Sequence, residues 1–329
     1  MPGLLDVLAA LHARGESGVL GIVFATLGST YQKPGALVLL DAAGLRYGVI
    51  SGGCLEPELE ARAQTVHTRG LADTIDFDTR SDEDLTFGTG TGCRGRIHLV
   101  LLPQSPSAPF TQALRKLRAS TSTLALSLTI EGDGIGSGNA SLDGESWDWG
   151  RDGDPAAPHA FDERSVVRLR IAPPARVLLF GCGPESIPLH EFIRRLGWRS
   201  TVIEHRGRWL KFAQRAGAEE VLESGPDTAA PVWRQQHFDA AIAMCHNYAL
   251  DMKHLAYCAA SDLSYIGLLG PAARRDQMLQ EIGADAAERL KLRLHAPVGL
   301  PLGGSGPDVL ALSIAAELQQ HFARVRGTR

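Results

Sequence analysis

The chain has 329 residues, which predicts about two domains, each large enough to bury a core of its own. Its 33 basic and 37 acidic side chains leave a formal net charge of −4, which excludes a general attraction to nucleic acid or to anionic lipid. The hydrophobic share of 44% and the many glycines and prolines are typical of a folded α/β protein, not of a disordered or fibrous chain.

The five cysteines are scattered along the chain and form no Cys-x-x-Cys pair. This odd number does not indicate a secreted disulfide framework, and no histidine stands at zinc-site spacing from a cysteine. The N-terminal segment has no basic leader, and no stretch approaches the roughly 18 consecutive apolar residues of a membrane span. We therefore expect a cytoplasmic protein with reduced thiols and no membrane partner.

The first part of the chain opens with a helical pattern and continues as β-rich runs separated by glycine-bearing turns. The expected strands span residues 19–25, 36–40, 45–50 and 96–102. A turn at 51–55 leads directly into a helical pattern that extends to about residue 69, and a second glycine-rich loop covers 87–95. We expect these elements to form a mixed α/β domain over residues 1–105.

From residue 176 onward, short apolar runs alternate regularly with helical segments. The expected strands span 177–180, 201–204, 220–223, 240–245 and 265–269. Such alternation predicts a doubly wound parallel sheet with helices on both faces. We therefore expect a Rossmann-like domain over 173–329, and we interpret 106–172, which is rich in glycine and acid beyond 132, as a connector with a hairpin or loop region.

The turn before the first long helix of the N-terminal domain carries a cysteine, Cys54, directly after two glycines. Backbone N–H groups and the helix dipole favour the thiolate form at such a position, which makes Cys54 a candidate nucleophile or soft metal ligand. The alternative is a small buried residue in a tight turn. Cys93 stands in the second glycine loop beside Arg94, where it could face an anion. The candidate ligand-binding residues of this half are Ser51, Gly52, Gly53, Cys54, Glu56 and Cys93.

A second glycine turn, with Gly181 and Gly183, follows a strand and opens a helix, and Glu204 ends the next strand 21 residues beyond Gly183. This context is that of a dinucleotide fold, in which the turn approaches a phosphate and the acid holds ribose hydroxyls. However, Ser186 replaces the third glycine and Pro184 lacks an N–H. The pattern therefore indicates a Rossmann fold and leaves open whether NAD(P) binds.

Two residues at the carboxyl ends of the expected strands can be interpreted either as ligand-binding or as purely structural. Glu204 either holds a ribose or is a solvated acid beside His205. His246, which follows the strand at 240–245, either contacts a ligand at the sheet edge or bonds nearby backbone beside a helix start capped by Asn247. We retain Gly181, Gly183, Glu204 and His246 as candidate cofactor-binding residues.

Several motifs carry a family resemblance. Residues 28–63, with a GS turn, a glycine-alanine strand and the GGCLE loop, resemble the N-terminal domain of the XdhC/CoxI family. Residues 177–206, 265–279 and 295–319 resemble the Rossmann domain of the same family. These matches occur in order along the chain and leave only about 105–172 unmatched. The resemblance implies an N-terminal XdhC-type domain followed by a Rossmann-like domain.

In function, the resemblance implies a cytoplasmic accessory protein that is not itself an enzyme. Such a protein binds the molybdenum cofactor, protects it during sulfuration and delivers it to a molybdenum hydroxylase such as xanthine dehydrogenase. By motif position, Cys54 would be the cofactor-binding cysteine and the metal ligand. The resemblance also implies a homodimer, a cysteine desulfurase partner and contact with the large subunit of the hydroxylase.

Two alternatives remain open at this stage. The first is an NAD(P)-dependent oxidoreductase that uses the Gly183 turn, with His246 as proton donor. The second is a docking module in which Cys54 belongs to the core. The chain departs from the family pattern at Pro184, where Gly-x-Gly-His is usual, and at 246–248, where His-Asp-His is frequent.

Overall fold

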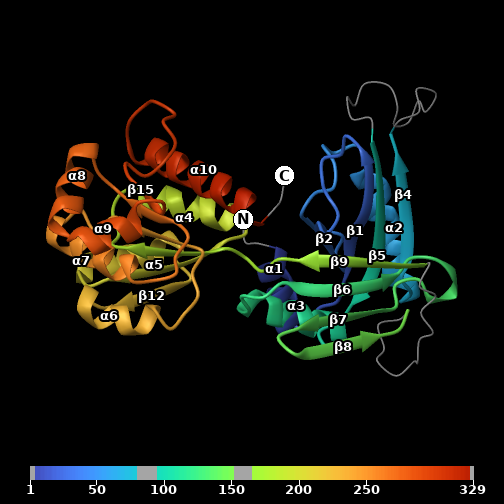
Figure 1. Ribbon diagram of the computed structural model, residues 1–329. Helices are drawn as coiled ribbons and strands as arrows, with labels where there is room; N and C mark the ends of the chain where they lie inside the picture. Colours follow the sequence, from blue (N-terminus) through green and yellow to red (C-terminus); the bar gives the residue numbers. More distant parts are fainter. Residues whose placement is uncertain (1–3, 80–94, 152–164, 327–329) are drawn as a thin grey trace. The chain divides into compact units, whose positions relative to one another are not determined.

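The computed structural model describes residues 4–79, 95–151 and 165–326, and the chain divides between Pro173 and Pro174 into two compact units (Figure 1). Within these described ranges, the N-terminal unit holds two antiparallel sheets with three α-helices, and the C-terminal unit holds one parallel sheet between two helical layers.

The first sheet of the N-terminal unit has five strands in the order β3-β2-β1-β5-β4. They are β1 (Gly18–Gly28), β2 (Leu37–Asp41), β3 (Arg46–Tyr47), β4 (Asp73–Asp78) and β5 (Gly95–Gln104). Helix α2 (Glu56–Arg69) covers one face with Leu59, Ala63 and Val66, which recur at helical spacing and are buried. The helix ends at Gly70, whose φ of 67° forms a left-handed cap.

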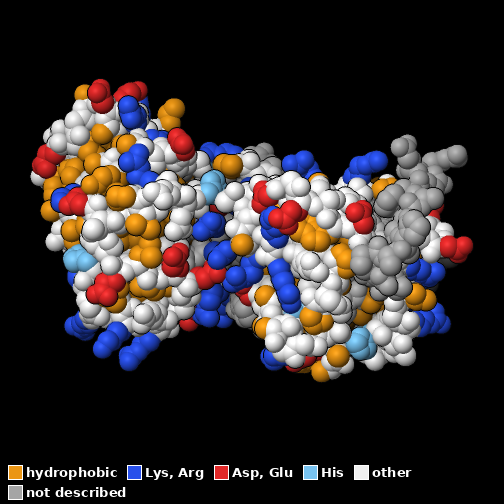
Figure 2. All heavy atoms as spheres, turned by 90° about the horizontal axis from the view of Figure 1, so that it is seen from below, with side chains coloured by type: hydrophobic (Ala, Val, Ile, Leu, Met, Phe, Trp, Pro, Cys, Tyr) orange, Lys and Arg blue, Asp and Glu red, His pale blue; other side chains and the backbone are white. Residues whose placement is uncertain are grey.

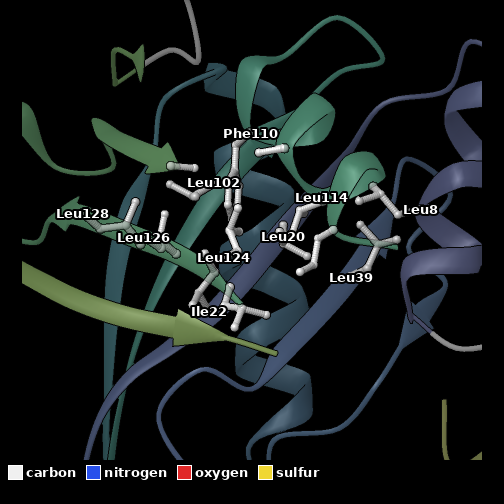
Figure 3. Packing of buried hydrophobic residues seen from close by; sticks show 14 of the residues in the cluster. Leu8, Leu20, Ile22, Leu39, Leu102, Phe110, Leu114, Leu124, Leu126 and Leu128 are labelled. Carbon is white, nitrogen blue, oxygen red and sulfur yellow. The ribbon is translucent and has the colours of Figure 1, made fainter. Parts of the chain in front are cut away.

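The other face of this sheet packs against helices α1 (Leu4–Ala13) and α3 (Pro109–Ala119) and against a second sheet. That sheet has the order β8-β7-β6-β9. Its strands are β6 (Leu124–Thr129), β7 (Gly138–Leu142), β8 (Glu145–Trp149) and β9 (Val166–Ile171), and a short 3-10 helix, η1, spans Gly132–Gly134. Figure 3 shows side chains of β1, β6 and α3 gathered in the shared core.

The segment 106–172 is not a connector between domains, as we expected, because its helix α3 and its four-stranded sheet both belong to the N-terminal unit. Leu124, Leu126 and Leu128 alternate toward the shared core, and Trp149 stacks on Phe110 with ring centroids 5.0 Å apart. The glycine and acidic residues that suggested a loop lie largely in the turns of this sheet and in 152–164, which is outside the described residues.

The C-terminal unit contains a parallel sheet in the order β12-β11-β10-β13-β14-β15, which confirms the expected doubly wound α/β fold. The strands are β10 (Arg176–Phe180), β11 (Arg199–Glu204), β12 (Glu220–Glu223), β13 (Ala240–Ala243), β14 (Ile266–Leu268) and β15 (Leu294–His295). The strand order reverses between β10 and β13, and this is where open α/β sheets bind their ligands.

Helices cover both faces of the parallel sheet (Figure 1). The first layer contains α4 (Ser186–Arg195), α5 (Gly207–Ala216) and α10 (Pro307–Arg326). The second layer contains α6 (Pro226–Trp233), α7 (Tyr248–Ala259), α8 (Ala272–Glu281) and α9 (Ala284–Leu290). The sequence patterns anticipated these helices except α6 and α9, which are short, and α6 carries Pro231 inside it.

None of the helices in the described ranges combines the length and the apolar character needed to cross a membrane. The face drawn in Figure 2 carries acidic and basic side chains among hydrophobic ones. This agrees with the small net charge of the chain.

Candidate functional site

The turn that precedes α2 is organised by one buried carboxylate, that of Glu56. Its Oε1 accepts hydrogen bonds from the N–H groups of Ile50 (3.3 Å) and Ser51 (3.0 Å), and its Oε2 accepts the Ser51 hydroxyl. The Ser51 Oγ in turn accepts the N–H groups of Gly53 (3.1 Å) and Leu55 (3.2 Å). Since Ser51 and Glu56 are both buried, this network fixes the turn from beneath.

The turn presents Cys54 to solvent. Residues 52–54 are exposed, whereas Ser51 and Leu55 on either side are buried. The Cys54 thiol lies 3.6 Å from the Ser51 Oγ, which tethers it to the same network. The interpretation of Cys54 as a core residue is therefore wrong, because its side chain stays outside the hydrophobic cluster of this unit.

The other cysteines in the described part of the chain, Cys182, Cys245 and Cys258, are buried. Burial raises the pKa of each of these thiols, and for Cys245 the nearby Asp251 raises the pKa further. Since the thiolate is the form that acts as a nucleophile or a metal ligand, burial and a raised pKa make these three thiols poorly suited to either role. Among the described cysteines, Cys54 is the one suited to bind a ligand.

A cavity of about 200 Å³ opens beside Cys54. It lies between the 51–55 turn, the end of β1 and the start of β5. Its lining residues are Ser29, Thr30, Tyr31, Ser51, Gly52, Cys54, Leu55, Thr79, Gly95 and Ile97. Tyr31 is 61% exposed, so an aromatic ring stands at the cavity with little cover. An exposed thiol and an exposed aromatic ring thus border the same cavity.

Gly52 and Gly95 line this cavity, and Gly53 lies between Gly52 and Cys54 in the same turn. Gly53 has a φ of 114°, a conformation that strains any L side chain. Gly95 is required by close approach, since a Cβ there would lie 2.2 Å from the Ser29 carbonyl oxygen. Gly52 has no heavy atom within 4 Å of its virtual Cβ, which leaves its backbone open to a ligand.

The donor set around Cys54 does not form a complete metal site. In the residues that the structure describes, no group of three or more His, Cys, Asp or Glu side chains is arranged to hold a metal ion. Cys54 would therefore contribute a single sulfur ligand, and the remaining ligands would come from the bound molecule itself. Cys93, the other candidate thiol of this half, lies outside the described residues.

The glycine turn after β10 uses its own N–H groups internally. The Cys182 N–H donates to Glu204 Oε2 (3.0 Å), and the Gly183 N–H donates to the Ser186 hydroxyl (2.9 Å). Pro184 has no N–H to offer. The N–H groups of Cys182 and Gly183, which a Rossmann turn ordinarily offers to a pyrophosphate, are therefore engaged within the chain.

Glu204 is buried and bound by its neighbours, so it is not a solvated strand end. Arg206 reaches both carboxylate oxygens with its guanidinium, at 2.8 Å and 2.6 Å. The N–H groups of His205 and Arg206 donate to Oε1. Burial alone would raise the pKa of Glu204, but these hydrogen bonds outweigh it and hold the pKa below its ordinary value.

Glu185 and His246 form a pair above Gly183. The His246 Nε2 lies 2.8 Å from the Glu185 Oε1, and a Cβ at Gly183 would lie within 3 Å of both side chains. Asn247 caps α7 by accepting the Leu250 N–H, as one interpretation of this segment expected. His246 itself has a φ of 54° and contacts a side chain, not the nearby backbone.

Two family models match the chain in order and together span well over half of it. The model described as the XdhC and CoxI family matches residues 11–78, and the XdhC Rossmann domain matches residues 177–318. The chain belongs to the XdhC and CoxI family. This confirms the family that the sequence motifs indicated.

Similar proteins are found over the full length of this family member. A relative from Bacillus subtilis (strain 168), named as a probable subunit of xanthine dehydrogenase, is 29% identical over 338 residues, which cover 97% of each chain. A crystal structure from Bacillus halodurans, described as a xanthine dehydrogenase, has a TM-score of 0.80 and 26% sequence identity. That match covers 99% of this chain and 97% of the other.

The predicted site residues of this XdhC-type chain fall into two groups, one in each unit. Ser51, Gly52, Gly53, Cys54 and Glu56 come together in the first, and Gly181, Gly183, Glu204 and His246 in the second. Two further residues of these sites, Tyr31 and Glu185, have little local signal in the sequence. Tyr31 was visible only as part of the GS turn, and Glu185 only as an acid that follows Gly-x-Gly-Pro.

Proposed function

We propose that this protein is a xanthine dehydrogenase accessory protein that binds the molybdenum cofactor, stabilises it for sulfuration and delivers it to a molybdenum hydroxylase. It acts as a cofactor carrier and not as an enzyme. The observation that carries the proposal is the exposed Cys54 thiol beside an open cavity, on the GGCLE loop of an XdhC-type domain.

The residues around Cys54 fit such a cofactor. A soft thiolate suits a molybdenum centre whose other soft ligands are the dithiolene sulfurs of the pterin. The cavity is smaller than the roughly 300–1,000 Å³ of sites that enclose a whole ligand. It would therefore take one end of the cofactor, with Tyr31 offering a stacking surface and Gly52 an unobstructed backbone.

A carrier must release its cargo, and the site supports release as well as binding. One thiolate and a partly open cavity hold the cofactor at few points, so a client that supplies more ligands can remove it. The partners in this proposal are a cysteine desulfurase, a second copy of the chain and the hydroxylase large subunit. Co-purification with each tests these partners.

The pterin content of the purified protein tests the proposal. The protein is produced in a host that makes the cofactor, and bound pterin is oxidised to its fluorescent derivative and quantified. We expect substoichiometric pterin in the wild type and at least a tenfold loss in Cys54→Ala. Cys182→Ala is the matched control, because it removes a buried thiol from the other unit and leaves this site intact. Equal pterin in wild type and Cys54→Ala would refute the assignment of Cys54.

A further inference from the structure

The C-terminal unit has a cavity of about 570 Å³ at the carboxyl edge of its sheet. Three segments form it: the turn after β10, His246 after β13, and the glycine-rich loop before α10. Its lining residues are Pro184, Glu185, His246, Leu300, Pro301, Leu302, Gly303, Gly304, Ser305, Gly306, Pro307, Val309, Leu310 and Ser313. This volume lies in the range of small-molecule sites, and the position is the switch point of the strand order.

The anion-binding position of this Rossmann turn is already filled by a side chain of the protein. Glu185 occupies the N-cap position of α4 without a side-chain capping hydrogen bond, and its carboxylate lies over Gly183, where a pyrophosphate would approach. The N–H groups of Cys182 and Gly183 are engaged, as described above. A phosphate would therefore meet a negative charge and find no donor on these residues.

The cavity also lacks the cations that phosphates prefer. None of the residues that line it within the described part of the chain is Lys or Arg. Arg206, whose guanidinium contacts this turn, is bound to Glu204 and to the Cys182 carbonyl oxygen. The charged groups around His246 are Glu185, Asp251 and Arg206. A neutral or cationic ligand is compatible with this environment, and a dinucleotide is not.

Glu185 is held in position for a ligand. Its side chain is 5% exposed, and His246 binds only one of its oxygens, Oε1. In the described structure, Oε2 accepts no hydrogen bond although the residue lines the cavity. His246 has a φ of 54°, in the left-handed region that non-glycine residues adopt rarely.

We propose that this cavity binds a flat nitrogen heterocycle with a 2-amino-4-oxopyrimidine edge, the group shared by guanine and pterins. A ring N–H and the neighbouring amino group donate to the Glu185 carboxylate, which has lone pairs beyond the one that His246 uses. The apolar side chains of Leu300, Val309 and Leu310 cover the ring faces. This site is separate from the Cys54 site. For guanine it goes beyond the proposed carrier function, and for a pterin it rests on that function, because the cofactor carries this ring.

Calorimetric titration of the full-length protein tests the site with two matched pairs of ligands. Guanosine is compared with inosine, and 6-hydroxymethylpterin with 6-hydroxymethyllumazine, since the second of each pair lacks the 2-amino group. We expect the amino compound to bind at least tenfold more tightly, as the loss of a hydrogen bond to a charged group predicts. If guanosine binds more tightly than 6-hydroxymethylpterin, the ligand is a guanine compound, and the opposite order identifies a pterin. NADH and inorganic phosphate should not bind this cavity.

Two variants locate the binding. Glu185→Gln keeps the size of the side chain and should weaken binding of the amino compound at least tenfold. The two ligands of each pair should then bind with equal affinity. Leu302→Arg changes an exposed residue of the cavity lining, so folding should be retained, and the bulky cation that it introduces into the lining should weaken ligand binding. Glu191→Gln, an exposed glutamate of the same helix, is the matched control and should bind as the wild type does.

The site would be refuted by equal binding within both pairs, by no binding at millimolar ligand, or by NADH binding that Glu185→Gln leaves unchanged. Cys54→Ala separates this inference from the carrier function. We expect that variant to keep the heterocycle affinity even where its bound pterin is lost, so either proposal can fail alone.

Discussion

Two glycine turns of this chain, 51–56 and 181–186, share a composition and differ in what they expose. Each contains a cysteine, and each leads into a helix. In the first turn, Glu56 and Ser51 accept hydrogen bonds from the backbone N–H groups, and the Cys54 thiol is exposed to solvent. In the second, Glu204 binds the N–H of Cys182 and the thiol enters the core.

This difference shows that glycine and cysteine positions alone do not define a ligand site. The residue that satisfies the N–H groups of the turn decides which atoms remain available. Glu56 lies within its own turn, whereas Glu204 comes from the next strand. The first turn therefore keeps an exposed thiol, and the second becomes a self-contained structure beside which a new cavity forms.

Replacing one glycine of each turn by alanine should give the largest difference between the two turns, measured as the loss in free energy of unfolding. A Cβ at Gly181 would lie 2.6 Å from the Cα of Cys245, and the φ of 91° disfavours any side chain. We expect Gly181→Ala to lower the free energy of unfolding by about 4 kcal/mol, from steric overlap and backbone strain together. Gly52→Ala meets no atom within 4 Å and should change stability by about 0.5 kcal/mol or less. Urea unfolding of both variants measures this, and equal losses would contradict the difference.

The chemical reactivity of the thiols should give the next largest contrast. A disulfide reagent such as DTNB should modify Cys54 about 100-fold faster than Cys182, because burial excludes the reagent and raises the pKa of the Cys182 thiol. Cys54→Ala should remove one fast-reacting equivalent from the native protein, and Cys182→Ala should remove none. Cys93 is present in all three proteins and cancels from the comparison. A loss of fast thiol in Cys182→Ala would show that the second turn opens in solution.

The fold was largely predictable from the sequence because its signals are local. Apolar runs at regular spacing predict the parallel sheet of the C-terminal unit, and a strand followed by glycine and a helix predicts both turns. The second sheet of the N-terminal unit was harder to predict. Its inward residues, such as Leu124 and Leu126, belong to short strands, and glycine and acid dominate the turns between them.

The candidate sites were only partly predictable, because their decisive contacts join distant residues. Ser51 and Glu56 bond to each other within one six-residue segment, so the sequence alone could single out Glu56 as an acid near Cys54. The Glu185–His246 pair joins residues 61 apart, and it forms because β10 and β13 are neighbours in the sheet. No local sequence pattern predicts that the Glu185 carboxylate will lie over Gly183, where a bound phosphate would otherwise approach.

The acid that closes the second turn should show its role through pH. The pKa of Glu204 is lowered in the folded protein from an ordinary value of 4.5, so at acid pH the unfolded chain binds more protons than the native one. Its stabilising contribution is therefore complete above the ordinary pKa and is lost as pH falls through the folded-state pKa. We expect Glu204→Gln to lower the free energy of unfolding by about 2 kcal/mol near pH 7, below the value for a fully buried pair because Arg206 is 32% exposed.

The same substitution should lower the free energy of unfolding progressively less as the pH falls below the ordinary pKa of a glutamate, because the wild-type carboxylate then also becomes protonated. Glu223→Gln is the matched control, because Glu223 pairs with Glu204 in the register of β11 and β12 but is exposed. Urea unfolding across this pH range measures both variants. A loss in Glu204→Gln that is independent of pH would mean that the shape of the side chain, and not its charge, holds the turn closed, and the turn would then stay shut to anions for steric reasons alone.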